Sequence, residues 1–172
     1  MEIRSVAVIG GGLMGSGIAQ VTARAGVRTV VVRGSGGPIA KLREKIEKAL
    51  GSELERGKLT AEERDFTLAN LVWGDAIDQA AECDLVIESI LEDIALKRAL
   101  FEKLDGLARS QTIFASNTST LRIGDLAAAT RSLAERAWQH PITGEEARFG
   151  FSTIESWFYQ ARKAKDPIDE LR

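Results

Sequence analysis

Residues 6–20 read Val-Ala-Val-Ile-Gly-Gly-Gly-Leu-Met-Gly-Ser-Gly-Ile-Ala-Gln, and this stretch decides the fold. An apolar, β-branched run predicts a strand that stops at Gly10, and apolar residues at helical spacing follow the glycines. Gly10, Gly12 and Gly15 have the spacing of a strand–turn–helix unit that binds a dinucleotide. The first permits the turn, the second lets the backbone approach a pyrophosphate, and the third allows close packing of helix and strand. The alternative is a glycine-rich turn in some other α/β protein.

Composition bounds the class of protein. The chain has 172 residues, a net charge of −2 and ordinary apolar and charged fractions, which indicate one sizeable core or one domain with a small appendage. The charge gives no reason to expect nucleic acid or an anionic membrane as a global partner. Cys83 is the single cysteine and lies among apolar residues, so we expect a small buried side chain in a reducing compartment. The sequence shows no signal peptide and no apolar run long enough to span a bilayer, so the expected location is cytoplasmic, or an organelle matrix after loss of a transit peptide. No metal site is expected.

Strand patterns alternate with helical ones along most of the chain, which predicts parallel βαβ units. We therefore expect an α/β fold of the doubly wound Rossmann type, with a mostly parallel sheet and a short helical C-terminal appendage. Gly26 is the expected C-terminal cap of the first helix, and Thr60-Ala61-Glu62-Glu63 has the pattern of a capping box. The expected strands are 6–9, 29–32, 71–73, 84–88 and 112–115, and the expected helices are 15–25, 38–56, a shorter one after Thr60, 95–107 and 123–129.

The pattern changes after about residue 136, where the β/α alternation stops. Two of the three tryptophans and the only tyrosine crowd into this part of the chain. We place a boundary near residue 137, with a dinucleotide-binding domain at 1–137 and a short helical hairpin tail of different origin at 138–172. Within the tail, helices are expected at 143–148 and 153–164.

Residues 1 to about 136 resemble the NAD-binding half of the 3-hydroxyacyl-CoA dehydrogenases. Several separate segments carry the resemblance, and their order and spacing follow the family throughout. These segments are 8–20, Glu55-Arg56-Gly57-Lys58-Leu59, Asp84-Leu85-Val86-Ile87-Glu88 with Glu92 and Lys97, and Ile113-Phe114-Ala115-Ser116-Asn117-Thr118-Ser119 with Leu121.

The resemblance implies a nicotinamide dinucleotide as cofactor and a role for each matching residue. The hydroxyl of Ser119 matches one that contacts both substrate and nicotinamide, and Asn117 matches an Asn of the same loop. For these two the alternative is turn chemistry and helix capping. The positions that match the cofactor site are Gly10, Gly12, Leu13, Met14, Gly15, Glu92 and Lys97.

The first departure from the family concerns the end of the second strand. The family has an Asp there, about 20 residues after the glycines, to hold the ribose hydroxyls. This chain has Arg33, followed by Gly34-Ser35. An Arg cannot accept those hydrogen bonds but can pair with a 2′-phosphate, so our hypothesis is weakened NAD binding with a shift toward NADP. Alternatively, Arg33 points into solvent and the cofactor site is simply poor.

The second departure concerns the helix that contacts coenzyme A in the family. A family Ser falls on Ala49 and a family Lys on Arg56, so the charge survives and the hydroxyl does not. Arg56 is thus a candidate contact for coenzyme A, although Arg56 and Lys58 together also fit a solvated basic end of a helix. An acyl-CoA partner is therefore doubtful.

The third departure concerns the catalytic base. The family continues into His-Phe-Phe-Asn-Pro, and an ungapped count puts its His on His140, while a register set by Glu135-Arg136 puts it on Pro141. Here Pro141-Ile142-Thr143-Gly144 follows, and the matching Glu and the all-helical half are missing. We expect a truncated dehydrogenase-like nucleotide-binding domain with little or no turnover, and leave open whether the chain is an enzyme.

The tail, about 143–172, is similar to the helix-turn-helix segment of some bacterial transposases, which leaves a DNA-binding module as an alternative function. Its charges are balanced, however, so strong DNA binding is not expected. We favour the interpretation that the aromatic face of this hairpin covers apolar surface of the domain over the interpretation that it contacts DNA. A third alternative is a non-catalytic scaffold, which could form a homo-oligomer through the aromatic tail.

Overall fold

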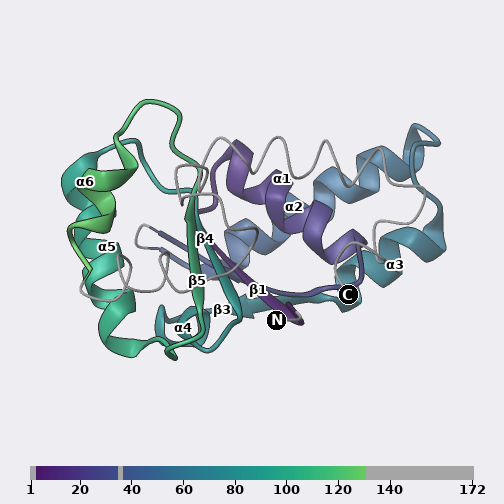
Figure 1. The fold of residues 1–172 in the computed structure, drawn as a ribbon. Helices are drawn as coiled ribbons and strands as arrows, with labels where there is room; N and C mark the ends of the chain where they lie inside the picture. The colour runs from purple at the N-terminus through teal and green to yellow at the C-terminus, as the bar shows by residue number, and fades with distance from the viewer. Residues whose placement is uncertain (1–2, 35–36, 131–172) are drawn as a thin grey trace, which may run out of the picture.

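The computed structural model describes residues 3–34 and 37–130, which form one parallel sheet with helices on both faces (Figure 1). The sheet has five strands in the order β3-β2-β1-β4-β5. The strands are β1 Ser5–Ile9, β2 Arg28–Val32, β3 Leu71–Gly74, β4 Leu85–Glu88 and β5 Ile113–Ser116. The helices are α1 Leu13–Arg24, α2 Ile39–Glu55, α3 Ala61–Ala69, α4 Asp78–Ala81, α5 Ile94–Leu107 and α6 Ile123–Ala127. The expected doubly wound fold is confirmed.

Most element boundaries fall within one or two residues of those expected from sequence, because turn and cap residues mark them. The capping box at the start of α3 is present: Thr60 Oγ1 accepts from Glu63 N, and a Glu63 oxygen accepts from Thr60 N. Gly26 follows α1 with φ +83° and donates to Ala23 O, as a C-terminal glycine should. The four-residue helix α4 was not expected, because one turn is too short to show a helical period.

Two separate hydrophobic cores lie on the two faces of the sheet. Alternate residues of β1 serve different cores, since Val6 and Val8 face one side while Ala7 and Ile9 face the other. Helices α1, α2 and α3 cover the first face, and α4, α5 and α6 cover the second (Figure 1). Cys83 belongs to the second core and is fully buried, which confirms the expectation for this thiol. Burial raises its pKa.

The order of the strands reverses between β1 and β4. From β1 the chain moves outward to β2 and β3, and it then returns to place β4 on the other side of β1. Ile9 and Glu88, the last residues of β1 and β4, lie side by side in the register. Open α/β sheets bind ligands at this type of reversal, beyond the carboxyl ends of the strands.

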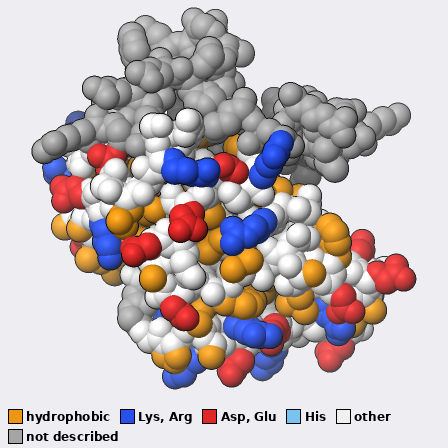
Figure 2. Space-filling model, turned by 90° about the horizontal axis from the view of Figure 1, so that it is seen from below, with side chains coloured by type: hydrophobic (Ala, Val, Ile, Leu, Met, Phe, Trp, Pro, Cys, Tyr) orange, Lys and Arg blue, Asp and Glu red, His pale blue; other side chains and the backbone are white. Residues whose placement is uncertain are grey.

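The described surface has no dominant charge on the face shown in Figure 2, where acidic and basic side chains alternate with apolar ones. Among residues 3–34 and 37–130, no helix is long and apolar enough to cross a membrane. The same residues contain no group of three or more His, Cys, Asp or Glu side chains placed to hold a metal ion. The domain boundary near 137, the tail helices and His140 lie outside the described residues, so these expectations stay predictions.

Candidate functional site

The glycines after β1 form a tight turn at the carboxyl edge of the sheet. Gly10 has φ +130°, and a Cβ there would lie 2.1 Å from the Ser89 carbonyl oxygen. A Cβ on Gly15 would lie 2.2 Å from the Gly10 carbonyl oxygen. The turn at Gly10 and the close helix–strand contact at Gly15 are therefore as expected, and neither position has room for a side chain.

Gly12 differs from the other two glycines because the space beside it is empty. A Cβ there would meet nothing within 4 Å, and Gly12 is the N-cap of α1 without a side-chain hydrogen bond. The first N–H groups of a helix have no acceptor within the helix and carry the positive end of its dipole. Leu13 and Met14 follow with 84% and 55% of their surface exposed, so two apolar side chains flank these N–H groups. This arrangement fits the phosphates of a dinucleotide.

Helix α2 contacts the glycine turn at Gly11. A Cβ on Gly11 would lie 2.9 Å from the Leu42 side chain, which packs beneath the turn. Lys45 Nζ donates to the Gly11 carbonyl oxygen at 3.1 Å. The sequence analysis did not single out Lys45, and its position one helical turn after Leu42 was the available signal. A second cation besides Arg33 thus lies near the phosphate cradle.

Arg33 follows β2 directly and is half-buried. Its guanidinium donates to the Pro38 carbonyl oxygen at 3.1 Å, and a Cβ on Gly37 would lie 3.5 Å from it. The side chain therefore folds over its own loop rather than extending freely. The choice between NAD and NADP stays a prediction.

A buried charge cluster closes the carboxyl ends of β4 and β5. Glu88, the last residue of β4, is completely buried, and its carboxylate has three donors. Lys97 Nζ lies 2.8 Å from both carboxylate oxygens, Ile90 N donates at 2.6 Å, and the Ser116 hydroxyl donates to the second oxygen. Glu88 was part of a quoted segment but not a proposed site residue. A carboxylate ending an otherwise apolar strand was the signal for it.

Glu92 connects this cluster to the loop after β5. One oxygen lies 3.0 Å from Lys97 Nζ, and the other accepts hydrogen bonds from the hydroxyls of Thr118 and Thr120. Partial burial alone would raise the pKa of Glu92, but the hydrogen bonds from Thr118, Lys97 and Thr120 outweigh it and lower the pKa to about 2. Glu92 is therefore a carboxylate at neutral pH.

Asn117 ties the loops after β4 and β5 together. Its backbone N–H donates to the Glu88 carbonyl oxygen at 2.7 Å, and its side-chain amide donates to Ser89 Oγ at 3.3 Å. Asn117 thus lies beside the glycine turn, because Ser89 is the residue whose carbonyl leaves no room at Gly10. This contact supports the turn-forming alternative, and the role of Asn117 toward a ligand stays a prediction.

Ser119 is exposed at the tip of the same loop. The hydroxyl that shapes the turn belongs to Thr118, which accepts from Leu121 N at 3.1 Å. Arg122 occupies the N-cap of α6. Helix capping by Ser119, the alternative from sequence, is therefore not what the structure shows, and its hydroxyl is available at the surface.

Arg56 lies well away from this edge. It is the C-cap of α2, which begins near the loop after β2 and runs for 17 residues, or about 25 Å. Its side chain is exposed at the turn between α2 and α3. A role toward coenzyme A would require a ligand that extends along this helical hairpin.

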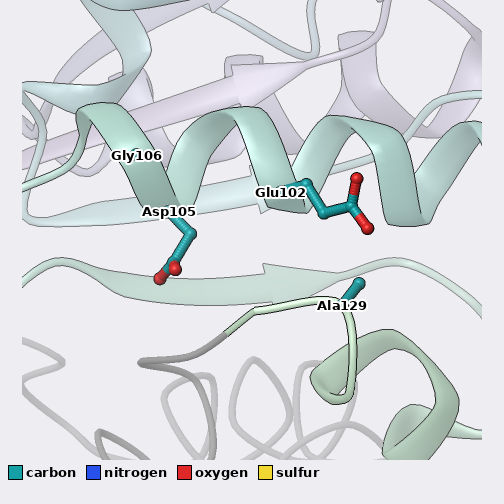
Figure 3. A pocket seen from close by; sticks show the side chains of 4 residues that line it. All are labelled: Glu102, Asp105, Gly106 and Ala129. Carbon is teal, nitrogen blue, oxygen red and sulfur yellow. The ribbon is translucent and has the colours of Figure 1, made fainter.

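The hollow in Figure 3 does not coincide with the glycine turn. It has a volume of about 440 Å³ and is lined by Glu102, Asp105, Gly106 and Ala129. The two carboxylate side chains project from one side of α5 toward the segment that carries Ala129 (Figure 3). A negatively charged hollow repels phosphates, so the candidate site remains the carboxyl edge of the sheet.

Comparison with known proteins identifies the family of this domain. A family model described as "3-hydroxyacyl-CoA dehydrogenase, NAD binding domain" matches residues 5–145. The chain is 40% identical to 3-hydroxybutyryl-CoA dehydrogenase of Mycobacterium tuberculosis over 130 residues, which cover 75% of this chain and 46% of the relative. It is 42% identical to the mitochondrial hydroxyacyl-coenzyme A dehydrogenase of Rattus norvegicus over 135 residues, covering 74% and 43%.

Solved structures give the same result. The crystal structure of 3-hydroxybutyryl-CoA dehydrogenase from Escherichia coli K12 matches with a TM-score of 0.72 and 37% identity, covering 77% of this chain and 28% of that one. The M. tuberculosis FadB2 structure matches with a TM-score of 0.73 and 39% identity, covering 77% and 47%. The chain thus spans less than half the length of these relatives.

Proposed function

The chain belongs to the 3-hydroxyacyl-CoA dehydrogenase family through its NAD-binding domain, and on this basis we propose that it binds a nicotinamide dinucleotide at the carboxyl edge of the sheet. The observation that carries the proposal is the contrast among the glycines. Gly10 and Gly15 have no room for a side chain, whereas Gly12 has free space beside the N-terminus of α1. Fold packing explains the first two glycines. Gly12 makes no such contact, but unlike the other glycines with free space beside them it lies in the turn at the N-terminus of α1, where a pyrophosphate would approach the backbone.

The glycine turn would hold the pyrophosphate, and the loops with Glu92, Asn117 and Ser119 would surround the nicotinamide half. When bound, the cofactor supplies hydride transfer, and the family reaction is transfer between NAD and the 3-hydroxyl of an acyl-CoA. The chain's own residues orient the dinucleotide and offer acceptors and donors around it. A cytoplasmic, reducing setting fits this role, because the thiol of Cys83 is free and buried.

A matched pair of glycine variants tests the binding site. Gly12→Ala and Gly17→Ala each add one methyl group where nothing lies within 4 Å, so both should fold normally. We expect Gly12→Ala to weaken NADH binding by about tenfold or more, measured by fluorescence titration, because the methyl group occupies the path of the pyrophosphate. Gly17→Ala should bind like the wild type. Equal binding by both variants, or no binding by the wild type, would overturn the proposal.

We further propose that these 172 residues have little or no turnover by themselves. The support is chemical: Ser119 offers an exposed hydroxyl but is not a base at neutral pH, and the sequence after His140 departs from the family's catalytic pattern. The measurement is NADH oxidation with acetoacetyl-CoA, followed by NADPH oxidation. Rates typical of the family would contradict this part of the proposal.

The most specific part of the proposal concerns the choice between NAD(H) and NADP(H). Arg33 stands where an acidic side chain would hold the ribose hydroxyls, and Lys45 brings a second cation to the glycine turn. We expect NADP(H) to bind at least as well as NAD(H), because a guanidinium pairs with a 2′-phosphate. Arg33→Gln should reduce the NADP(H)-to-NAD(H) affinity ratio by about tenfold. A clear preference of the wild type for NAD would refute the shift.

A further inference from the structure

The ammonium group of Lys97 lies between two carboxylates of the protein itself. A lysine carries three N–H donors. Its three acceptors are Glu88 Oε1 and Oε2, each at 2.8 Å, and Glu92 Oε2 at 3.0 Å. The side chain is only 1% exposed. The resemblance places Lys97 near the cofactor, and in this structure its charge is paired with these two carboxylates.

The cluster places an exposed carboxylate and a completely buried one on the same lysine. Glu88 is held on all sides within the protein, whereas the side chain of Glu92 is 40% exposed and reaches the loop after β5. The order of contacts is thus Glu88, Lys97, Glu92 and then the hydroxyls of Thr118 and Thr120. Each step is a charge-assisted hydrogen bond, which fixes direction as well as distance.

Burying such a pair is a poor way to gain stability. Removing two charges from water costs about as much as their attraction returns, and apolar residues of similar volume often serve equally well. Val86 and Ile87 precede Glu88 on β4, and Ser116 is its buried polar neighbour on β5. Stability alone is therefore a weak explanation for a carboxylate at this position.

We propose that Glu88 is a positioning residue that sets the loop 117–120 through Lys97 and Glu92. Its carboxylate holds the lysine ammonium, the ammonium orients Glu92, and Glu92 holds the hydroxyls of Thr118 and Thr120 on both sides of Ser119. Ser116 adds a direct hydrogen bond from β5 to Glu88. The loop that presents Asn117 and Ser119 is thereby aligned with the strand ends before any ligand arrives.

This inference rests on the proposed dinucleotide site, so its test needs a readout that does not involve the cofactor. Amide hydrogen exchange in the free protein supplies one, because Leu121 N donates to Thr118 Oγ1 within the positioned loop. Glu88→Gln keeps the shape of the side chain but turns its amide donor toward Lys97 or Ser116. We expect exchange at Leu121 to become about tenfold faster, with NADH affinity falling by about tenfold at a temperature where the variant is fully folded.

The matched control is Glu102→Gln, the same chemical change at an exposed position of α5. It should leave both the Leu121 exchange rate and the NADH affinity at wild-type values. A Glu88→Gln protein with wild-type exchange at Leu121 and wild-type affinity would overturn the proposal. If the wild type does not bind NADH, the proposed function fails, but the exchange measurement still decides whether Glu88 positions the loop.

Two further variants separate positioning from folding. The double variant Glu88→Gln, Lys97→Met removes the buried charge pair, so stability should recover while Glu92 loses its partner and affinity stays low. Full recovery of NADH affinity in this protein would show a purely structural role and would contradict the proposal. If Glu88→Gln does not fold, Ser116→Ala removes one donor while the buried Glu88 and Lys97 stay paired, and it should produce a smaller increase in the same exchange rate.

Discussion

The two ends of strand β4 carry acidic side chains that are used in different ways. Asp84 immediately precedes β4 and is partly exposed, and its Oδ2 accepts from the backbone N–H groups of Arg4 and Ser5 and from the Ser5 hydroxyl. Glu88 ends the same strand, is completely buried, and has a lysine ammonium as its main partner. The two carboxylates are only four positions apart in sequence.

The difference separates a partly exposed carboxylate that joins two strands from a buried one beside the proposed dinucleotide site. At the amino end, Asp84 joins β4 to the start of β1 through neutral donors, and its one charged donor, Arg109, is exposed, so water could replace these contacts at moderate cost. At the carboxyl end, charges are buried beside a turn without side chains and beside loops with exposed hydroxyls. Variants at the two ends should therefore differ in how much they lower the free energy of unfolding and in whether they change NADH affinity.

The largest effect should come from removing the cation at the carboxyl end. Lys97→Met leaves the Glu88 carboxylate buried without its counter-charge, so we expect the free energy of unfolding to fall by about 3–5 kcal/mol. Urea denaturation at neutral pH measures it. Lys103→Met, at an exposed position of the same helix, is the control and should change little. Equal stability of the two variants would mean that the buried pair is not energetically distinct.

The next effect concerns the turn at this same end. Gly10→Ala forces an L side chain at φ +130° and places its Cβ 2.1 Å from the Ser89 carbonyl oxygen. We expect a loss of about 2–3 kcal/mol in unfolding free energy, together with loss of NADH binding. Gly17→Ala in α1 is the control, and it should be neutral or slightly stabilising because Ala favours a helix. A stable Gly10→Ala protein would show that the loops after β1 and β4 can separate freely.

At the amino end, Asp84→Asn should be milder. The amide oxygen of Asn can still accept some of these hydrogen bonds, but the negative charge is gone. We therefore expect the free energy of unfolding to fall by about 1–2 kcal/mol and the NADH affinity to stay unchanged. Asp75→Asn, an exposed acid after β3, is the control. A reduced NADH affinity of Asp84→Asn would contradict the distinction between the two ends of the sheet.

The pH dependence of Asp84 has a definite sign. Partial burial tends to raise its pKa, but hydrogen bonds from Arg4, Ser5 and Arg109 outweigh this effect and lower the pKa in the folded state. Its contribution to stability is therefore present above the unfolded pKa, about 3.9, and is lost as the pH falls through the lower folded pKa. Urea midpoints between pH 5 and pH 2 should decline less steeply for Asp84→Asn than for the wild type.

The smallest effect should come from removing the cation at the amino end. Arg109 donates to Asp84 Oδ1 at 3.0 Å and to the Glu82 carbonyl oxygen at 2.7 Å, but its side chain is 55% exposed. Arg109→Met should therefore cost less than about 1 kcal/mol, because an exposed ion pair gains little over water. The same urea assay compares it with Lys97→Met. A loss as large as that of Lys97→Met would contradict the contrast between an exposed and a buried pair.

The fold was largely predictable because its signals are local. The β-branched runs, the capping box at Thr60 and the glycine at position 26 each act through nearby backbone, and each lies where it was expected. The four residues of α4 escaped prediction, since their helical form depends on packing against β1 and α5 rather than on a period. The positions of Gly10, Gly12 and Gly15 were likewise readable from spacing alone.

The candidate site was only partly predictable. Glu92, Asn117 and the glycine turn meet at one edge as expected, because parallel strands bring their carboxyl ends together. The pairing of Lys97 with Glu88 and the contact of Lys45 with the Gly11 carbonyl were not predicted. These contacts join residues on different elements, and no spacing along the chain reveals them.

The sequence by itself determined the order of strands and helices, the location of the glycine turn and the family of the domain, because period, caps and glycine spacing are properties of neighbouring residues. Only the tertiary structure decided how the charged side chains are used. It placed Asp84 against the backbone N–H groups of Arg4 and Ser5. It buried Glu88 against Lys97, whose ammonium group also contacts Glu92. The physical reason is that burial and the set of donors around a charge arise from elements distant in sequence, and these set both its free energy and its orientation.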